Sequence, residues 1–247
     1  MHYDVRLFRD KLKAFFIHLT ISLLTVLVAY FLIHLLWYPT PLFKATDASK
    51  IFIMILLVDL ILGPLLTFVV YKKHKKTLKI DLTVIVLIQL SALSYGLYSV
   101  YQARPVWIAY VVDRFELVRA NDILEEDEKI YHLPKFGPKY IYVDLAGLNA
   151  TEKLDSILDE TTYNISPSQK PKFYNNFELA KPLVIKNSQD VNLLNNYNHA
   201  IEVRKFLERY PTADSFLPLK ANAVDMTVLI EKQGGGKVIK IVDLRPW

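Results

Sequence analysis

The sequence predicts a membrane protein, with a bundle of three transmembrane helices followed by a C-terminal α+β domain that has a mainly antiparallel sheet. Of the 247 residues, 52% are hydrophobic, and the mean hydropathy is +0.21, which is high for a soluble domain. The apolar residues gather in three blocks, each close to the ~20 residues that cross ~30 Å of hydrocarbon. The remainder has mixed composition and is long enough for one compact domain.

These blocks divide the chain into a membrane domain over residues 1–104 and a second domain over residues 105–247. The three spans are expected at about residues 14–37, 51–71 and 80–102, with a cytoplasmic KKHKK loop at 72–79. The first block is too long for the apolar region of a signal peptide, and no small-x-small cleavage site lies near its end. We therefore interpret it as an uncleaved signal anchor.

Positive charge indicates the orientation of the predicted bundle. Basic residues crowd the N-terminal arm and the second connection, whereas the first connection has few. They are Arg6, Arg9, Lys11 and Lys13 in the arm and Lys72, Lys73, Lys75, Lys76 and Lys79 in the second connection. Because short cytoplasmic segments are rich in Lys and Arg, we expect both in the cytoplasm. Three spans then place the second domain on the opposite side, which for a bacterial inner membrane is the periplasm.

The basic character of the chain does not indicate a nucleic-acid partner. The formal net charge is +5 and the pI is near 9.1, but much of the excess lies in the two cytoplasmic segments. We interpret it as a topology signal, with contacts to anionic membrane lipids as a by-product. The chain has no Cys, which excludes disulfides and Cys-ligated metals.

Each predicted span carries a stripe of small or polar residues at helical spacing, a pattern that lets transmembrane helices approach closely. In the first span the stripe includes His18 and Ser22. In the other two it includes Asp59, Gly63, Thr67, Gln89 and Gly96, which together with Pro64 are the six candidate partner-binding residues. A charge near the bilayer centre costs about 2.5 to 3.5 kcal/mol. Asp59 is therefore expected to face the bundle interior, to be neutral or to have a partner.

Asp59 and Gln89 are expected to share a hydrogen bond, direct or through water. Pro64 has no N–H, so it is expected to free the carbonyl of Leu60 and to kink the second span. Two interpretations stay open at this stage: these residues lock the three helices together, or they form a groove that recognises another transmembrane helix. Ion or proton transport is a weaker alternative, because three spans with one carboxylate make a poor pathway.

Alternating and β-branched residues predict the strands of the second domain. One long strand is expected over 106–118 (VWIAYVVDRFELV), another over 139–147, and a short one over 177–186. A hairpin is expected over 225–244, because two alternating runs flank the turn Gly234–Gly236.

Two helices are expected to cover this sheet. Asn149 and Glu152 have the spacing of a capping box, which predicts a helix beginning there. Ser188 is expected to open the second helix and Pro211 to end it. The apolar face of this second helix is expected to comprise Leu194, Tyr197 and Ile201.

The second domain shows no catalytic motif. It has no G-x-S-x-G, no phosphate-binding loop and no H-E-x-x-H, and its histidines are His132 and His199. We therefore expect no enzymatic activity, no catalytic residues, no cofactor and no metal. The acidic run at residues 125–128 is interpreted as a solvated loop rather than a cation site.

Four segments, in this order and spacing, carry a resemblance to a known family. They are VDLILGPLLT (58–67), KIDLTVIVLIQLSALSYGLYSVYQARPV (79–106), VVDRFELVRANDI (111–123) and VDLRPW (242–247). The chain resembles the TfpX/TfpZ family of type IV pilin accessory proteins over most of its length, least so between Thr151 and Pro211.

The resemblance implies an inner-membrane protein encoded beside a major pilin gene and needed for surface piliation by that pilin, with no established active site. The positions that match the family motifs are Asp59, Gly63, Pro64, Gln89, Gly96, Arg104, Pro105, Asp113, Arg114 and Phe115. We interpret the last five as residues that orient the second domain. Asp113 and Arg114 form either an ion pair that orients the domain or a solvated pair, and both interpretations stay open.

The expected partners are the cognate type IV major pilin, the pilus assembly machinery and membrane lipids, and no nucleic acid. A pilin in the inner membrane has its N-terminal helix in lipid and its head in the periplasm. We therefore expect the bundle to contact the helix and the second domain to contact the head. The alternatives are an enzyme that modifies pilin, such as a glycosyltransferase, and a regulator of pilus assembly.

Overall fold

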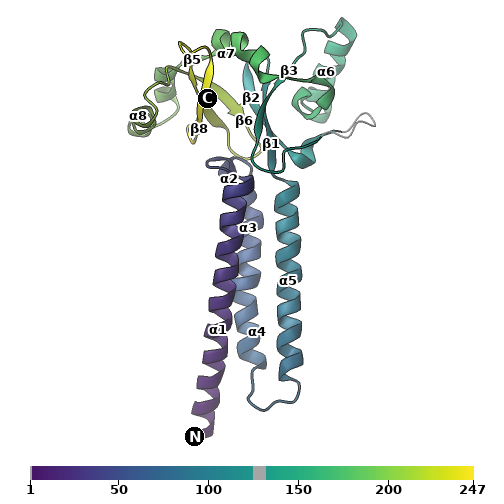
Figure 1. Cartoon of the computed structure of the whole chain (residues 1–247), viewed down its shortest axis with the longest axis vertical. Helices are drawn as coiled ribbons and strands as arrows, with labels where there is room; N and C mark the ends of the chain where they lie inside the picture. The colour runs from purple at the N-terminus through teal and green to yellow at the C-terminus, as the bar shows by residue number, and fades with distance from the viewer. Residues whose placement is uncertain (1, 125–131) are drawn as a thin grey trace. The chain divides into compact units, whose positions relative to one another are not determined.

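In the computed structural model, which describes residues 2–124 and 132–247, the chain forms two compact units. The helical unit comprises Met1–Leu36 and Ala48–Gln102, and the sheet unit comprises Trp37–Asp47 and Ala103–Trp247. Figure 1 shows the helices of the first and the curved sheet of the second.

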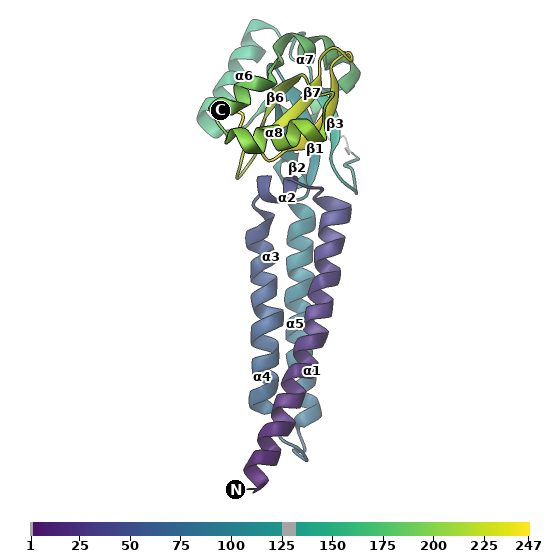
Figure 2. The same ribbon diagram turned by 90° about the vertical axis from the view of Figure 1, so that its left-hand side faces the viewer.

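The helical unit consists of three long helical stretches that run side by side (Figure 2). Their elements are α1 (His2–Leu32), η1 (Ile33–Trp37), α3 (Ala48–Leu57), η2 (Val58–Leu62), α4 (Gly63–Val70) and α5 (Leu78–Gln102). The stretches Val5–Trp37, Ala48–Val70 and Leu78–Gln102 are each long and apolar enough to cross a membrane. Many of their large apolar side chains are exposed. The three predicted spans are thus present as helices, and α1 continues through the basic arm.

The second stretch contains a π-helical turn, η2, directly before Gly63 and Pro64. The N–H of Gly63 donates to the carbonyl of Val58, five residues back. In this register the carbonyl of Asp59 faces the nitrogen of Pro64, which carries no hydrogen. The prediction that Pro64 frees the carbonyl of Leu60 assumed α-helical spacing. In the π-helical register it is the carbonyl of Asp59 that faces Pro64 and needs another donor.

The sheet unit is built on an eight-stranded sheet of order β4-β3-β1-β2-β6-β7-β8, with β5 paired to β6. The strands are β1 (Pro105–Val111), β2 (Arg114–Arg119), β3 (Lys139–Val143), β4 (Tyr174–Asn175), β5 (Gln189–Asp190), β6 (Ser215–Lys220), β7 (Met226–Glu231) and β8 (Lys237–Val242). Only the described pairings β1–β3 and β2–β6 are parallel. The expected hairpin at 225–244 is confirmed as β7 and β8, with Gly235 and Gly236 at positive φ in its turn.

The predicted single strand over 106–118 is wrong, because the segment folds back on itself as the hairpin β1–β2. Its turn includes Val112 at a φ of 53°, a conformation that disfavours β-branched residues. The N–H of Asp113 donates to the carbonyl of Val111 at 2.6 Å. The apolar and β-branched composition of the segment therefore conceals the turn.

The helices α6 (Ala150–Tyr163), α7 (Lys181–Asn187) and α8 (Ala200–Arg209) accompany the sheet. Figure 1 places α6 and α8 beside opposite ends of the sheet. The capping box of Asn149 and Glu152 is confirmed by bonds of 2.8 and 2.9 Å. The strand expected over 177–186 is wrong, because this segment forms the turn η6 (Phe177–Ala180) and α7, with a proline in the first turn of α7.

The helix expected from Ser188 to Pro211 is interrupted. The segment begins with β5, continues as the 3-10 turn η7 (Val191–Asn196), and becomes α-helical only in α8. Leu194 is buried, but Ile201 is 81% exposed and Val203 turns toward the core instead. The break shifts the helical phase, which explains why the predicted apolar face is wrong.

The first connection belongs to the sheet unit. The boundary predicted at residue 104 assigned this connection to the membrane domain. In the structure, Leu42 and Ala45 of α2 (Leu42–Ala45) are buried in the core with Ile108. The carbonyl of Ala45 also accepts a 2.9 Å hydrogen bond from the N–H of Ala223. The sheet unit is therefore discontinuous in sequence.

Candidate functional site: a polar seam in the helical unit

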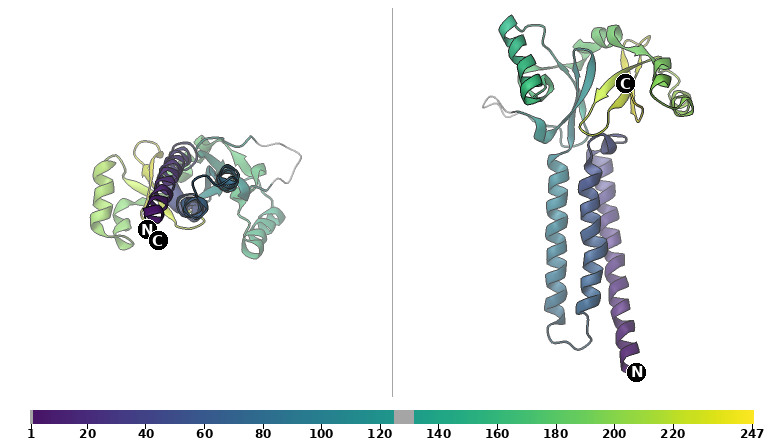
Figure 3. Two further views of the ribbon diagram at one scale, coloured as in Figure 1. Left: turned by 90° about the horizontal axis from the view of Figure 1, so that it is seen from below. Right: turned by 180° about the vertical axis from the view of Figure 1, so that it is seen from behind.

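The three helical stretches meet at a polar seam, which we define as His18 of the first stretch, Asp59 and Thr67 of the second, and Gln89 of the third. His18 of α1 lies 2.6 Å from the Thr67 hydroxyl of α4 through Nδ1, and 2.7 Å from Oε1 of Gln89 in α5 through Nε2. Gln89 Nε2 donates to the main-chain carbonyl of Asp59 at 3.3 Å. The seam thus joins all three helical stretches, which Figure 3 (left) shows end-on.

The hydrogen-bond directions in the seam follow from the acceptors present. Oε1 of Gln89 can only accept, so Nε2 of His18 must be protonated and donate to it. In the neutral imidazole, Nδ1 then accepts the hydroxyl hydrogen of Thr67. Gln89 in turn supplies the donor that Pro64 lacks for the carbonyl of Asp59. The expected pairing of residues 59 and 89 is thus present through the main chain of Asp59.

Two glycines make this close packing possible. A Cβ at Gly63 would lie 2.1 Å from Nε2 and 2.5 Å from Cδ of Gln89. A Cβ at Gly96 in α5 would lie 2.4 Å from Cγ1 of Ile55 in α3. Non-bonded contacts this short do not occur, so a Cβ at either position would force the facing side chain, Gln89 or Ile55, to move.

Asp59 lies inside the unit with its carboxyl group only partly satisfied. The residue is 4% exposed, and its Oδ1 atom accepts no hydrogen bond. The prediction that Asp59 faces the bundle interior is therefore confirmed. A polar atom that is buried without a partner costs free energy.

The structure brings five of the six candidate partner-binding residues together around the seam. Asp59, Gly63, Pro64 and Thr67 are buried along one stretch, and Gln89 is half-buried opposite them. Gly96 is also buried but contacts Ile55 further along α5. Another helix would therefore meet other side chains first, unless the three stretches separated. His18, which the sequence analysis placed in the polar stripe of the first span but left out of the site, is the residue that connects the helices.

The residues expected to orient the second domain have local partners in the sheet unit. Arg104 is buried and donates through Nε to the carbonyl of Pro134 at 3.2 Å. Pro105 begins β1 and is buried. Phe115 is fully buried in the core against Tyr110. These three residues stabilise the fold of this unit.

Asp113 and Arg114 lie at the β1–β2 turn. Because a strand rises about 3.3 Å per residue, the turn is roughly 20 Å along β1 from Arg104. Arg114 Nη1 lies 3.7 Å from Asp113, but Arg114 Nη2 is closer to Glu116, at 3.0 Å, and to Glu160 of α6, at 3.2 Å. Arg114 therefore ties β2 to α6.

A second polar cluster that the sequence analysis missed surrounds Glu116 in β2. Its carboxylate is buried and accepts from Ser168 Oγ at 2.8 Å, from Ser166 Oγ, and from Arg114 Nε at 3.0 Å. Buried charges in proteins are normally paired in this way. The signal available in the sequence was an acid at an inward-facing position of an apolar strand.

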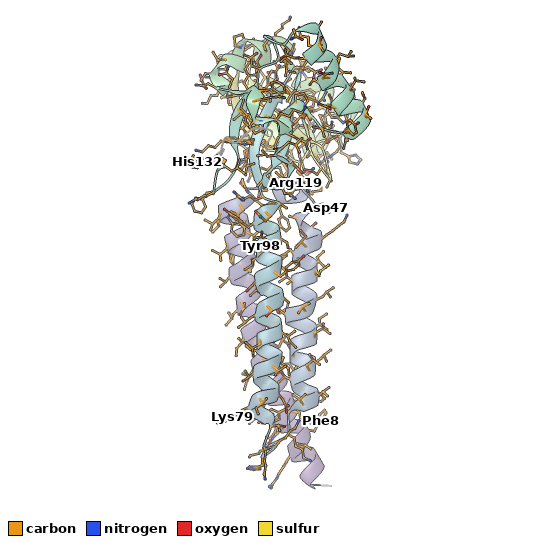
Figure 4. The ribbon with its side chains drawn as sticks, turned by 90° about the vertical axis from the view of Figure 1, so that its right-hand side faces the viewer. Phe8, Asp47, Lys79, Tyr98, Arg119 and His132 are labelled. Atoms are coloured by element: carbon orange, nitrogen blue, oxygen red, sulfur yellow. The ribbon has the colours of Figure 1, made fainter. Side chains whose placement is uncertain are left out.

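Within residues 2–124 and 132–247, no group of three or more His, Cys, Asp or Glu side chains is placed to hold a metal ion. The acidic run at residues 125–128 lies outside the described residues. Figure 4 shows Arg119 and His132 among the side chains of the sheet unit. Arg119 is engaged with Asp122 through Nε and Nη2, at 2.9 and 2.7 Å.

Comparison with known proteins gives similarity to fimbrial assembly proteins. Residues 6–46 match the family described as Fimbrial assembly protein FimB. The "Fimbrial assembly protein, serogroup I" of Dichelobacter nodosus is 39% identical over 132 residues, which are 53% of this chain and 50% of that protein. The protein of serogroups C1 and C2 of the same organism is 37% identical over 123 residues, 49% of this chain and 92% of that protein.

The extent of these matches differs between relatives. The matched part of the chain spans about half the length of the serogroup I and serogroup E1 proteins but nearly all of the protein of serogroups C1 and C2. No solved structure matches the chain.

Proposed function

Because this chain belongs to the family of fimbrial assembly proteins, we propose that it is a membrane-anchored accessory factor for type IV fimbriae. It binds its cognate major pilin and promotes display of that pilin on the cell surface. The observation that carries the proposal is the match to fimbrial assembly proteins in a chain with three helices of spanning length and a separate folded unit.

The proposed location is the bacterial inner membrane, with the N-terminus in the cytoplasm and the sheet unit in the periplasm. The basic residues of α1 and of the exposed loop at 72–77 support this orientation, because short cytoplasmic segments are rich in Lys and Arg. A pilin that waits in the membrane offers a helix in lipid and a head outside it, so a partner with one unit in each compartment fits both. The sheet unit contacts the head, and the assembly machinery is a further partner.

We assign the polar seam to packing of the bundle. His18, Thr67 and Gln89 bond to one another across three helices, and Asp59 is 4% exposed. The polar groups of His18, Thr67 and Gln89 already bond to one another and so are not free to bind a pilin helix. The pilin helix therefore contacts the outer apolar surface of the helical unit, where large side chains such as Leu87 and Ile53 are exposed.

The proposed role is not enzymatic. Three charged side chains of the sheet unit support this: Glu116, Arg114 and Arg119 bond to neighbouring protein groups. A pilin-modifying enzyme needs groups that are free to act on a substrate.

The test is a strain that lacks the gene, in which sheared surface fimbriae and the intact mass of cellular pilin are measured together. We expect fewer fimbriae and an unchanged pilin mass. Loss of a discrete mass from the pilin would instead refute the accessory role and indicate a modifying enzyme.

Complementation of this strain tests the assignment of the seam. At equal levels of membrane-inserted protein, Asp59→Asn and Asp59→Leu should both restore fimbriae to the wild-type amount. If Asp59→Leu restores fewer fimbriae than Asp59→Asn at equal protein level, hydrogen bonding by this residue serves the partner rather than the packing.

A further inference from the structure

A lateral groove of about 460 Å³ opens on the helical unit between α1, α4 and α5. Its body is apolar, lined by Ile17 and Ile21 of α1 and by Leu82 and Val86 of α5. At one end it is bounded by Lys13 and by Tyr71, the residue after α4. The same end of the unit carries Lys79 and Phe8, as Figure 4 shows.

The groove changes from polar to apolar along its length. Lys13 and Ile21 are eight residues apart on α1, which corresponds to about 12 Å along a helix. The polar atoms deeper in the lining belong to His18 and Thr67, and they already bond to each other at 2.6 Å. The body therefore offers apolar contact over about 12 Å, and the end offers a cation. This gradient suits an amphiphile that lies parallel to the helices.

The charges around the open end favour an anionic head group. The segment that joins Tyr71 to α5 carries exposed lysines, among them Lys72, Lys73 and Lys76. Acidic groups are also present: Asp10 lines the groove, and Asp81 is paired with Lys75 at 2.7 Å. The lysines of the segment outnumber these acids, so the local potential is positive. Basic pockets between transmembrane helices on the cytoplasmic side are typical sites for anionic lipid head groups.

We propose that this groove binds one anionic phospholipid, with an acyl chain against Ile17, Ile21 and Val86 and the phosphate beside Lys13 and Tyr71. The inference rests on the membrane anchoring in the proposed function and not on the fimbrial role. A transmembrane helix is a poorer occupant, because an apolar helix supplies no anionic group to pair with Lys13 and the exposed lysines of the 72–76 segment.

The experiment is native mass spectrometry of the purified full-length chain in detergent, titrated with phosphatidylglycerol or with phosphatidylcholine of the same acyl chains. We expect one phosphatidylglycerol to bind more tightly than phosphatidylcholine. Lys13→Gln should weaken phosphatidylglycerol binding about fivefold, since one basic residue near an anionic lipid contributes about that factor. Lys79→Gln is the matched control, because Lys79 lies at the same end of the unit but does not line the groove. It should leave binding unchanged.

A second pair of variants tests the apolar body. Ile17 and Leu24 are both exposed on α1, two turns apart, but only Ile17 lines the groove. Ile17→Trp should abolish the one-to-one adduct with both lipids, and Leu24→Trp should retain it. Far-UV circular dichroism and size-exclusion profiles equal to wild type show that the variants are folded.

Three results would overturn the proposal. One is equal affinity for the two lipids, and another is equal weakening by Lys13→Gln and Lys79→Gln. The third is an Ile17→Trp chain that keeps its lipid but no longer crosslinks to the pilin helix, which would make the groove a protein site. A gene deletion that leaves fimbriae normal would refute the fimbrial role alone, because lipid binding is measured on the purified chain without pilin.

Discussion

Gly63→Ala tests whether the polar seam requires that position 63 carry no side chain. The new Cβ would lie 2.1 Å from Nε2 of Gln89, so the amide of Gln89 must move away. It then loses the bonds to His18 and to the carbonyl of Asp59. Hydrogen bonds between transmembrane helices contribute about 0.6 kcal/mol each on average. The two together account for about 1.2 kcal/mol.

Two further effects decide the net magnitude. Adding a methyl group to a well-packed interior costs typically 1 to 3 kcal/mol, whereas replacing Gly by Ala in a helix favours the folded state by about 1 kcal/mol. We therefore expect Gly63→Ala to lower the free energy of unfolding by about 1 to 3 kcal/mol. In a Gln89→Ala background the obstructing side chain is gone. There the same substitution should be neutral or stabilising by up to about 1 kcal/mol.

Equilibrium unfolding in mixed micelles of dodecyl maltoside and sodium dodecyl sulfate, followed by far-UV circular dichroism, measures both effects. Gly147→Ala is the control, since a Cβ at Gly147 meets no atom within 4 Å, and it should change little. The reasoning is refuted if Gly63→Ala does not destabilise the wild-type chain, or destabilises it equally with and without the Gln89 side chain.

Three other substitutions test the packing and charge of both units. The Cβ of Gly96→Ala would lie 2.4 Å from Ile55 Cγ1, so this substitution should lower the free energy of unfolding by about 1 to 3 kcal/mol in the same micelle assay. Ile55→Ala should restore the stability, and failure of this rescue would contradict the contact. Glu116→Leu should cost about 1 to 3 kcal/mol, because the hydroxyls of Ser166 and Ser168 lose their buried acceptor while Arg114 keeps Glu160. Glu116→Gln should be milder, and equal thermal unfolding of the two variants would contradict a role for the charge. Burial disfavours the charge of Asp214, yet main-chain N–H groups of the β7–β8 turn hold the pKa of its carboxyl below the usual value. The stability that this lowered pKa gives the folded chain is present above about pH 4, the pKa of the carboxyl group in the unfolded chain. It is lost as the pH falls through the pKa of the folded chain. The chain should therefore lose thermal stability in acid and Asp214→Asn should lose less, and parallel pH profiles would contradict this.

Local signals in the sequence predicted some elements of the sheet unit and missed others. The capping box at Asn149 and the tri-glycine hairpin depend on interactions between residues near in sequence, and both are present. The β1–β2 turn was missed because Val112 adopts a positive φ that its own propensity opposes. In the sheet, β1 pairs with β3 and β2 pairs with β6. Local sequence patterns do not predict these pairings, because the paired strands are distant in sequence.

The sequence predicted most of the residues of the candidate site but not the hydrogen bonds that connect them. Helical spacing placed Asp59, Gly63 and Thr67 on one stripe, and the structure keeps them together. The roles of His18 and of the Asp59 carbonyl depend on the π-helical turn and on the rotation of each helix about its axis. Both are set by packing between helices, which the sequence of one helix does not specify.

By itself, the sequence determined three helices of spanning length, because hydropathy summed over about twenty residues depends only on composition and order. It also determined the basic segments that bear on orientation. The tertiary structure alone decided which helix faces meet, so it revealed that Gly63 and Gly96 are contact points and that Asp59 is enclosed. It also decided that Leu42 and Ala45 belong to the core of the sheet unit, because burial depends on which residues, however distant in sequence, occupy the same space.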